Sequence, residues 1–395
     1  MTSSIYRSEA GRRAVLDSYR RLLALWPVPR EERVVPTREG DTFVVSSGPA
    51  DAPALVLLHG ASSSAHEWLG DVAAWSSRFR VHAVDVIGEA GLSAPSRPPI
   101  ESDAYAGWLD DVLDGLGLRA ASLVGRSFGG FLALRFALAR QQRVRRLVLL
   151  APAGLGRQRP SFFLAAPVLM VLGRRGRGRL QRLVIGPGGL GPGARPVLEH
   201  LSLVQQHLRP RVVRFPAADP AELARLEVPV LAIVGARDAL FDSEGTRRLL
   251  EASVPDVEVR ILPHVGHAVV GQTQEVLAFL AADGQEPTAS LRDRIEADMR
   301  DALRRGDRAV VAPLRSVLSA LDNATAVPLA AAPAATVGRS GDVPRKVLSE
   351  ADERDVLRRE TDERRHALAT YTRLGREAEA ERLRAEIAVL ERYHA

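Results

Sequence analysis

Gly125-Arg126-Ser127-Phe128-Gly129 is the stretch of this 395-residue sequence that decides the fold. It matches the pattern G-x-S-x-G, follows the apolar run Ser122–Val124 and opens the apolar stretch Phe131–Ala139. A strand, a sharp turn and a helix in this order place a serine in a strained backbone at the C-terminal edge of a sheet, with its hydroxyl exposed. Glycines flank the serine because a Cβ would clash where strand and helix converge. We therefore expect Ser127 to be a nucleophile.

A serine hydroxyl needs a base before it can attack a carbonyl, and His267 is the candidate. It ends the run Leu262-Pro263-His264-Val265-Gly266-His267, which follows the predicted strand Val257–Leu262. The glycine turn places an imidazole at the same sheet edge as Ser127. His264 remains the alternative, and the glycine directly before His267 favours His267 because it frees the backbone there.

The base in turn needs a carboxylate that orients it. Val230–Val234 is predicted to be a strand, and Asp238 follows it in the next loop, with Asp242 as the second candidate. The chain order Ser127, Asp238, His267 is the order associated with a nucleophile on a strand-to-helix turn.

An oxyanion that forms during acyl transfer needs hydrogen-bond donors, each worth on the order of 10²–10³ in rate. The backbone N–H of Phe128, at the start of the predicted helix, is one donor. We expect the Ala61 N–H, in the loop His59-Gly60-Ala61 after the strand Ala54–Leu58, to be the other. His59 and His66 are interpreted as residues that shape this region rather than as catalytic bases.

Apolar runs alternate with helical stretches up to about residue 283, which predicts an α/β fold with a mostly parallel sheet and helices on both faces. An amphipathic helix over residues 7–25 precedes them, and residues 153–225 interrupt them as an insertion. The predicted strands are Phe43–Ser47, Ala54–Leu58, Arg80–Asp85, Ser122–Gly125, Leu147–Ala151, Val230–Val234 and Val257–Leu262.

The composition changes at Gly284-Gln285-Glu286-Pro287, and only helical patterns follow. We therefore predict an α/β domain over residues 1–283, a linker over 284–289 and an all-α domain over 290–395.

The composition also excludes several classes of site. With no Cys, the chain has no disulfide, thiolate zinc site, iron–sulfur cluster or cysteine nucleophile. No His, Asp or Glu cluster has metal-ligand spacing. The motif Gly186-Pro187-Gly188-Gly189-Leu190-Gly191 lies in the insertion, contains Pro187 and is followed by Pro192, and no acid about 20 residues further on can be placed at a strand end, so it does not indicate a dinucleotide site. We expect neither a metal nor a cofactor.

The net charge of +6 does not by itself indicate nucleic-acid binding, because Lys346 is the only lysine and arginines inflate the pI of about 10.3. Five arginines between residues 174 and 182 follow the apolar run 162–172. They are interpreted as a solvated face, with contact to an anionic membrane or an acidic substrate as the alternative. The sequence shows neither a secretory signal nor an apolar run of membrane-spanning length, so a cytoplasmic location without a transmembrane segment is expected.

Five segments together resemble a serine α/β-hydrolase of the carboxylesterase type over residues 1 to about 283. They are His59-Gly60, Asp85-x-x-Gly88-x-x-Gly91-x-Ser93, Gly125-x-Ser127-x-Gly129, Gly235-x-x-Asp238 and Gly266-His267. The resemblance implies hydrolysis of a small-molecule carboxylic ester through an acyl-enzyme. It also implies that residues 153–225 form a helical cap over the active site.

The C-terminal segments Leu291–Asp322 and Ser349–Tyr393 are similar to the Yqey-like family, which is related to the tail of the B subunit of tRNA-dependent amidotransferases. The resemblance implies a second hypothesis, in which the tail binds tRNA or a translation protein and the hydrolase fold serves as a scaffold. From Ser290 onward the chain carries 20 Arg and Lys against 19 Asp and Glu, whereas a phosphate-binding surface should be basic.

Overall fold

The computed structural model describes residues 5–187, 189–191, 193–211, 213–282, 291–325, 348 and 350–393. The chain divides into two compact units, Met1–Leu280 and Ala281–Ala395, and each is described by itself. The predicted linker 284–289 lies outside the described residues.

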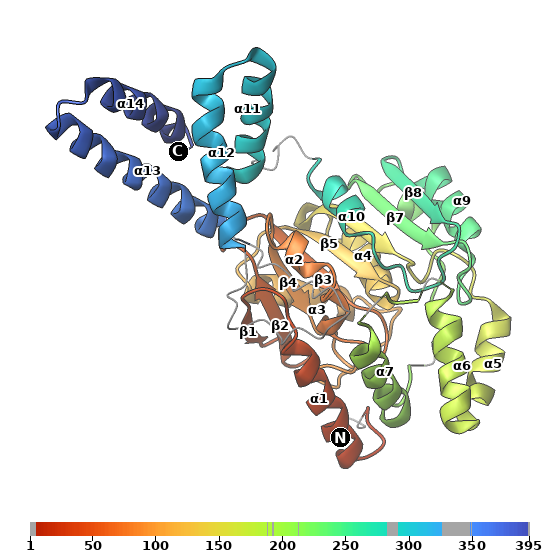
Figure 1. The fold of residues 1–395 in the computed structure, drawn as a ribbon. Helices are drawn as coiled ribbons and strands as arrows, with labels where there is room; N and C mark the ends of the chain where they lie inside the picture. The colour runs from red at the N-terminus through yellow and green to blue at the C-terminus, as the bar shows by residue number, and fades with distance from the viewer. Residues whose placement is uncertain are drawn as a thin grey trace. The chain divides into compact units, whose positions relative to one another are not determined.

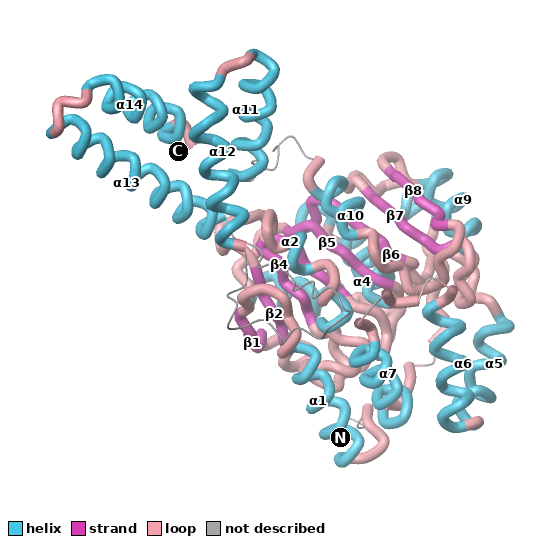
Figure 2. Tube along the Cα trace, in the orientation of Figure 1, coloured by secondary structure: helices cyan, strands magenta, loops and turns pink. Residues whose placement is uncertain are grey.

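One eight-stranded sheet forms the centre of the first unit (Figures 1 and 2). Its strands are β1 (Glu31–Val35), β2 (Thr42–Ser47), β3 (Ala54–Leu58), β4 (Arg80–Val84), β5 (Ala121–Arg126), β6 (Val144–Leu150), β7 (Val230–Gly235) and β8 (Val257–Leu262). They lie in the order β1-β2-β4-β3-β5-β6-β7-β8. β2 pairs antiparallel with β1 and β4, and the remaining pairs are parallel. All the carboxyl ends from β4 to β8 therefore meet at one edge, where a site assembled from loops belongs.

Helices cover both faces of the sheet, which confirms the predicted fold class. Side chains alternate along β3: Leu55 and Leu57 pack under α1, α2 and α10, whereas Val56 and Leu58 pack under α3 and α4. Burial on both faces explains why this strand reads as a continuous apolar run. These helices are α1 (Glu9–Leu23), α2 (Val72–Trp75), α3 (Ala104–Gly115), α4 (Phe128–Ala139) and α10 (Thr273–Leu280), and α9 (Ser243–Ser253) packs beside β8.

The insertion between β6 and β7 is helical, as predicted. It comprises α5 (Pro160–Val171), α6 (Gly173–Ile185), α7 (Arg195–His207) and α8 (Pro220–Leu223). The N-terminal segment holds α7 in place: Arg7 N–H donates to the His207 carbonyl at 2.8 Å, and Arg209 N–H donates to the Ile5 carbonyl at 2.8 Å. The first residues of the chain are therefore part of the support of the cap.

The sequence analysis missed β1 and slightly overextended the first helix. β1 is an edge strand whose first four residues are exposed, so Glu31, Glu32 and Arg33 give it no apolar signal. The helix predicted over 7–25 spans Glu9–Leu23, because the Ser8 hydroxyl accepts the Gly11 N–H at 3.0 Å and caps its start.

The second unit consists of helices in its described residues: α11 (Leu291–Arg305), α12 (Arg308–Ala324), α13 (Glu350–Arg373) and α14 (Glu377–Glu391). Its core combines Leu314, Val317 and Leu321 of α12 with Leu357 of α13 and Leu390 of α14. The predicted all-α architecture of the tail is confirmed.

Candidate active site

Ser127 stands at the sharp turn between β5 and α4. Its φ of +52° lies in the left-handed region, which costs a residue with a Cβ on the order of 1–3 kcal/mol. Two glycines make the turn possible: a Cβ on Gly125 would lie 2.4 Å from the Gly129 carbonyl oxygen, and a Cβ on Gly129 would lie 2.0 Å from the Leu58 carbonyl oxygen. The tight contact between strand and helix therefore holds the serine in its strained conformation.

His267 and Asp238 extend from Ser127 in a line of hydrogen bonds. The Ser127 hydroxyl donates to His267 Nε2 at 2.9 Å, and His267 Nδ1 donates to Asp238 Oδ2 at 2.8 Å. A carboxylate can only accept here, so the proton lies on Nδ1 and Nε2 is left as an acceptor. Both the histidine and the aspartate are buried, which strengthens these polar contacts.

The carboxylate of Asp238 is fixed by its own loop. Its second oxygen accepts the N–H groups of Leu240 at 2.7 Å and Phe241 at 3.1 Å. The Phe241 ring also lies 5.4 Å from the His267 ring, centroid to centroid. These contacts hold the carboxylate, so that it can fix the orientation of the imidazole.

The two alternative residues do not join this arrangement, although both belong to the described chain. His264 is exposed on the turn before His267. Asp242 is the residue at the N-cap of α9 and forms no hydrogen bond with His267. Of the candidates named from the sequence, the structure brings together Ser127, Asp238 and His267.

The two expected oxyanion donors lie at the first residue of α4 and in the loop after β3. Phe128 is the first residue of α4, whose N–H has no partner within the helix. Ala61 lies in the loop after β3. Its neighbour Gly60 lies so close to the turn at Ser127 that a Cβ on Gly60 would lie 3.6 Å from the Ser127 Cβ. In the described part of the chain, no acceptor is assigned to the Ala61 N–H.

Two carboxylates, one half-buried (Glu67) and one buried (Glu89), fix the backbone on either side of Ala61. Gly60 N–H donates to Glu67 Oε2 at 2.7 Å, and Ser62 N–H donates to Glu89 Oε2 at 2.7 Å. Ser62 is itself held at a φ of +58°. The neighbouring N–H groups are thus occupied, and the loop is held in one conformation with the Ala61 N–H between them.

Each of these carboxylates has an arginine partner, and sequence reasoning missed all four residues. Glu67 pairs with Arg126 at 3.3 Å, inside the G-x-S-x-G segment itself. Glu89 accepts from Arg211 of the insertion at 3.0 Å, and the Arg211 guanidinium stacks 4.9 Å from the centre of the Phe128 ring. Glu89 lies inside the Asp85–Ser93 motif, so an acid at the sheet edge after β4 was the available signal.

His59 and His66 have structural positions. His59 Nδ1 donates to the Gly60 carbonyl at 2.8 Å, and its Nε2 accepts the Val86 N–H at 2.9 Å, which ties together the loops after β3 and β4. His66 is buried 4.8 Å from the His200 ring of α7, centroid to centroid, and burial lowers the pKa of His66 well below its usual value. Neither ring is available to Ser127.

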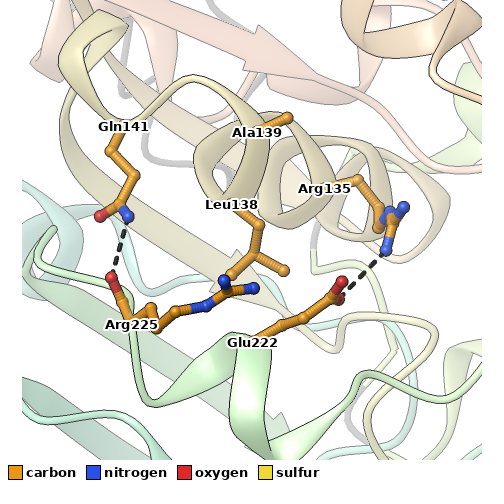
Figure 3. A pocket seen from close by; sticks show the side chains of 6 residues that line it. All are labelled: Arg135, Leu138, Ala139, Gln141, Glu222 and Arg225. Carbon is orange, nitrogen blue, oxygen red and sulfur yellow. Dashed lines mark hydrogen bonds and ion pairs between the residues drawn. The ribbon is translucent and has the colours of Figure 1, made fainter.

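The pocket in Figure 3 is separate from this arrangement. Its volume is about 260 Å³, and it is lined by Arg135, Leu138, Ala139, Gln141, Glu222 and Arg225. It lies at the C-terminal part of α4, whereas Ser127 is the N-cap residue of this 12-residue helix, about 12–18 Å away along the axis. Among the described residues, no three His, Asp or Glu side chains are grouped to hold a metal ion.

Comparisons with known proteins identify relatives for both parts of the chain. The alpha/beta hydrolase fold family matches residues 53–177, and the Yqey-like protein family matches residues 292–395. Carboxylesterase YbfK of Bacillus subtilis is 34% identical over 277 residues, which cover 67% of this chain and 92% of the relative. The uncharacterized carboxylesterase nap of the same organism is 31% identical over 256 residues, with 64% and 85% covered.

Solved structures extend the likeness to three dimensions. The crystal structure of carboxylesterase CesB (YbfK) from Bacillus subtilis is 33% identical, with a TM-score of 0.61 over 69% of this chain and 98% of that chain. The naproxen esterase (carboxylesterase NP) from the same organism is 29% identical, with a TM-score of 0.60 over 67% and 96%. Both likenesses concern about two thirds of this chain, and the Yqey-like match concerns the remainder.

Proposed function

The chain belongs to the carboxylesterase family of α/β-hydrolases and is a carboxylic ester hydrolase, and from this premise we propose that Ser127 forms the acyl-enzyme. In the first step the Ser127 Oγ attacks the ester carbonyl while its proton passes to His267 Nε2. Asp238 accepts the Nδ1–H and stabilises the imidazolium that results. The imidazolium then protonates the departing alcohol as the C–O bond breaks.

The N–H groups of Ala61 and Phe128 hold the oxyanion of the tetrahedral intermediate. Water then attacks the acyl group with His267 as base, and a second tetrahedral intermediate releases the acid and restores Ser127. His267 mediates every proton transfer in these steps, and the backbone N–H groups of Ala61 and Phe128 donate hydrogen bonds only. The observation that carries the proposal is the line of hydrogen bonds at 2.9 Å and 2.8 Å from Ser127 through His267 to Asp238.

Aromatic side chains beside His267 indicate an apolar substituent on the ester. Phe241 contacts the His267 ring, and Phe215 of the insertion lies 6.4 Å from Phe241 and 6.0 Å from Phe128, centroid to centroid. Phe215 is half-buried, so part of its ring remains accessible. We expect the acyl or alcohol group to lie against these rings, and Phe215→Ala to raise KM for apolar esters more than for acetate esters.

A panel of carboxylic esters tests the mechanism with the wild type and Ser127→Ala. We expect turnover by the wild type only, and labelling by a fluorophosphonate of the wild type only, because only an activated serine reacts with it. Equal turnover by both proteins would reject Ser127 as the nucleophile. Labelling without ester turnover would point instead to a thioester, a lactone or a C–C bond as the substrate.

Nucleic-acid binding by the Yqey-like helices stays a prediction. Several exposed arginines on α13 and α14 are paired with acids, as Arg365 with Glu391 at 2.9 Å and Arg384 with Glu377 at 2.8 Å. A phosphate backbone is bound by cations that are free to replace its counterions. A mobility shift of tRNA by the whole chain at low salt tests the point, and its absence would remove the hypothesis.

A further inference from the structure

Helices α5 and α6 form a hairpin within the insertion (Figure 1), and α5 exposes an apolar stripe. Leu164, Val168, Val171 and Leu172 are 75%, 61%, 87% and 61% exposed. Their spacing of four, seven and eight residues places them on one face of a helix. An apolar face normally packs on a core, and this one has no cover within the described residues.

The second helix of the hairpin adds unpaired positive charge beside that stripe. Gly176 and Leu180 of α6 face inward, whereas Arg175, Arg179 and Arg182 are exposed at helical spacing on the other side. No Asp or Glu occurs between Asp114 and Glu199. Among the described residues, none of the five α6 arginines forms an ion pair, and these are Arg174, Arg175, Arg177, Arg179 and Arg182.

This combination fits an anionic lipid surface. An amphipathic element at a bilayer interface buries apolar side chains among the acyl chains and places arginines at the headgroup phosphates. The 12 residues of α5 measure about 18 Å, far less than the ~30 Å of a hydrocarbon core. Within the part of the chain that the structure describes, no helix is long and apolar enough to cross a membrane. The hairpin is therefore suited to lie in the interface.

The base of the hairpin adjoins the catalytic histidine. α6 ends at Ile185, and the next residue, Gly186, packs so closely on Gly266 that a Cβ on Gly186 would lie 2.5 Å from the Gly266 Cα. His267 is the next residue. A surface that held the hairpin would thus lie next to the loop that carries the base.

We propose that the α5–α6 hairpin docks this enzyme on anionic lipid bilayers and that its substrates include esters dissolved in that surface. The docking is inferred from the exposed residues of the hairpin alone, whereas the substrate class rests on the proposed function. The charge complementarity selects anionic over neutral lipid, and the apolar stripe selects a bilayer over a soluble polyanion.

Vesicle flotation with the full chain tests the docking. The vesicles are either pure phosphatidylcholine or equal parts phosphatidylcholine and phosphatidylglycerol. We expect binding to the anionic vesicles only, and Ser127→Ala should bind as the wild type does, because docking needs no catalysis. Each arginine near an anionic surface is expected to contribute about fivefold to the binding, so Arg175→Gln/Arg179→Gln/Arg182→Gln should weaken it about a hundredfold.

A matched variant removes the same net charge elsewhere in the first unit. Arg20, Arg119 and Arg145 are exposed, and their triple change to Gln should leave vesicle binding within about twofold of the wild type.

A second variant, Val168→Ser/Val171→Ser, tests the apolar stripe and keeps the arginines. It should still bind at low salt but should be released at about 0.5 M salt, where the wild type keeps part of its binding. Equal weakening by both arginine triples, or equal binding to both vesicle types, would overturn the proposal.

Two further measurements separate docking from catalysis. The hairpin variants should hydrolyse a short soluble ester as the wild type does, which also shows that they fold. With a long-chain ester carried in the anionic vesicles, the Arg175→Gln/Arg179→Gln/Arg182→Gln variant should lose most of its turnover.

Wild-type binding to a tRNA fragment in preference to anionic vesicles would overturn the lipid assignment. Absence of ester turnover with vesicle binding intact would reject the substrate class and leave the docking in place.

Discussion

Glu89 Oε1 and Arg211 Nε form a buried ion pair at 3.0 Å between residues 122 positions apart. Glu89 uses its other oxygen to hold the Ser62 N–H, next to the expected oxyanion donor Ala61. Arg211 belongs to the insertion and stacks on Phe128, the other donor. One ion pair thus connects the cap to both sides of the oxyanion site.

Glu89→Gln should lower kcat about tenfold with little change in KM, because a loosened loop still offers the Ala61 N–H but positions it less well. This is less than the ~10²–10³ expected when a donor is lost outright. Removing one partner of a buried pair should also lower the free energy of unfolding by about 3–5 kcal/mol. Steady-state kinetics and urea unfolding measure the two effects.

The double variant Glu89→Gln/Arg211→Met separates positioning from stability. With both charges gone, most of the unfolding free energy should return, whereas kcat should stay low because nothing restores the carboxylate on Ser62. Recovery of kcat together with stability would show that Glu89 serves the fold alone.

Asp238→Asn should lower kcat by about 10³–10⁴, because an amide can present its NH₂ to Nδ1 and so favour the wrong tautomer of His267. Asp242→Asn is the matched change at the second acid, and it should leave kcat within about twofold. The comparison uses one soluble ester and the melting temperature of each variant. A large loss with Asp242→Asn and none with Asp238→Asn would reverse the assignment of the acid.

The sequence predicted a strand correctly where every residue of the strand has the same buried surroundings, because each residue is then apolar. Ala54–Leu58 is buried on both faces, so every residue carries the signal, whereas the exposed edge strand Glu31–Val35 carries almost none. Ser127 was predictable because the steric demands of its turn require glycines at fixed offsets. Glu67 acts only through contacts that the fold creates, and no spacing in the chain marks it, whereas the position of Glu89 after a predicted strand was a signal without a partner to interpret it.

His200 should make the protein less stable at acidic pH. It is buried with no partner on either ring nitrogen among the described residues, and burial, followed by Arg21, lowers its pKa from 6.5 to about 4. Below pH 6.5 His200 binds a proton in the unfolded chain, whereas in the folded chain it binds one only near pH 4. Protonation of His200 therefore does not reduce the free energy of unfolding above pH 6.5, and it lowers that free energy by up to about 3 kcal/mol as the pH decreases to about 4.

His200→Leu should flatten this decline and leave the protein more stable than the wild type at pH 5. Buried His66 and His82, whose pKa values are lowered in the same direction, keep a residual slope. His264→Gln changes an exposed histidine and should leave the profile unaltered. Unfolding free energies from pH 4 to 8 decide the matter, and an unchanged slope in His200→Leu would remove His200 as the cause.

Gly186→Ala should lower kcat about tenfold, because the added methyl group would push on Gly266 and displace His267 from Ser127 by a few tenths of an ångström. Gly189 offers a control in the same loop. Both glycines have positive φ, +83° and +66°, so alanine strains both backbones, but a Cβ on Gly189 would meet no atom within 4 Å. Gly189→Ala should therefore lose about 1 kcal/mol of stability and keep its kcat. Equal loss of kcat in both variants would assign the effect to the backbone strain of the cap rather than to the contact with the histidine loop.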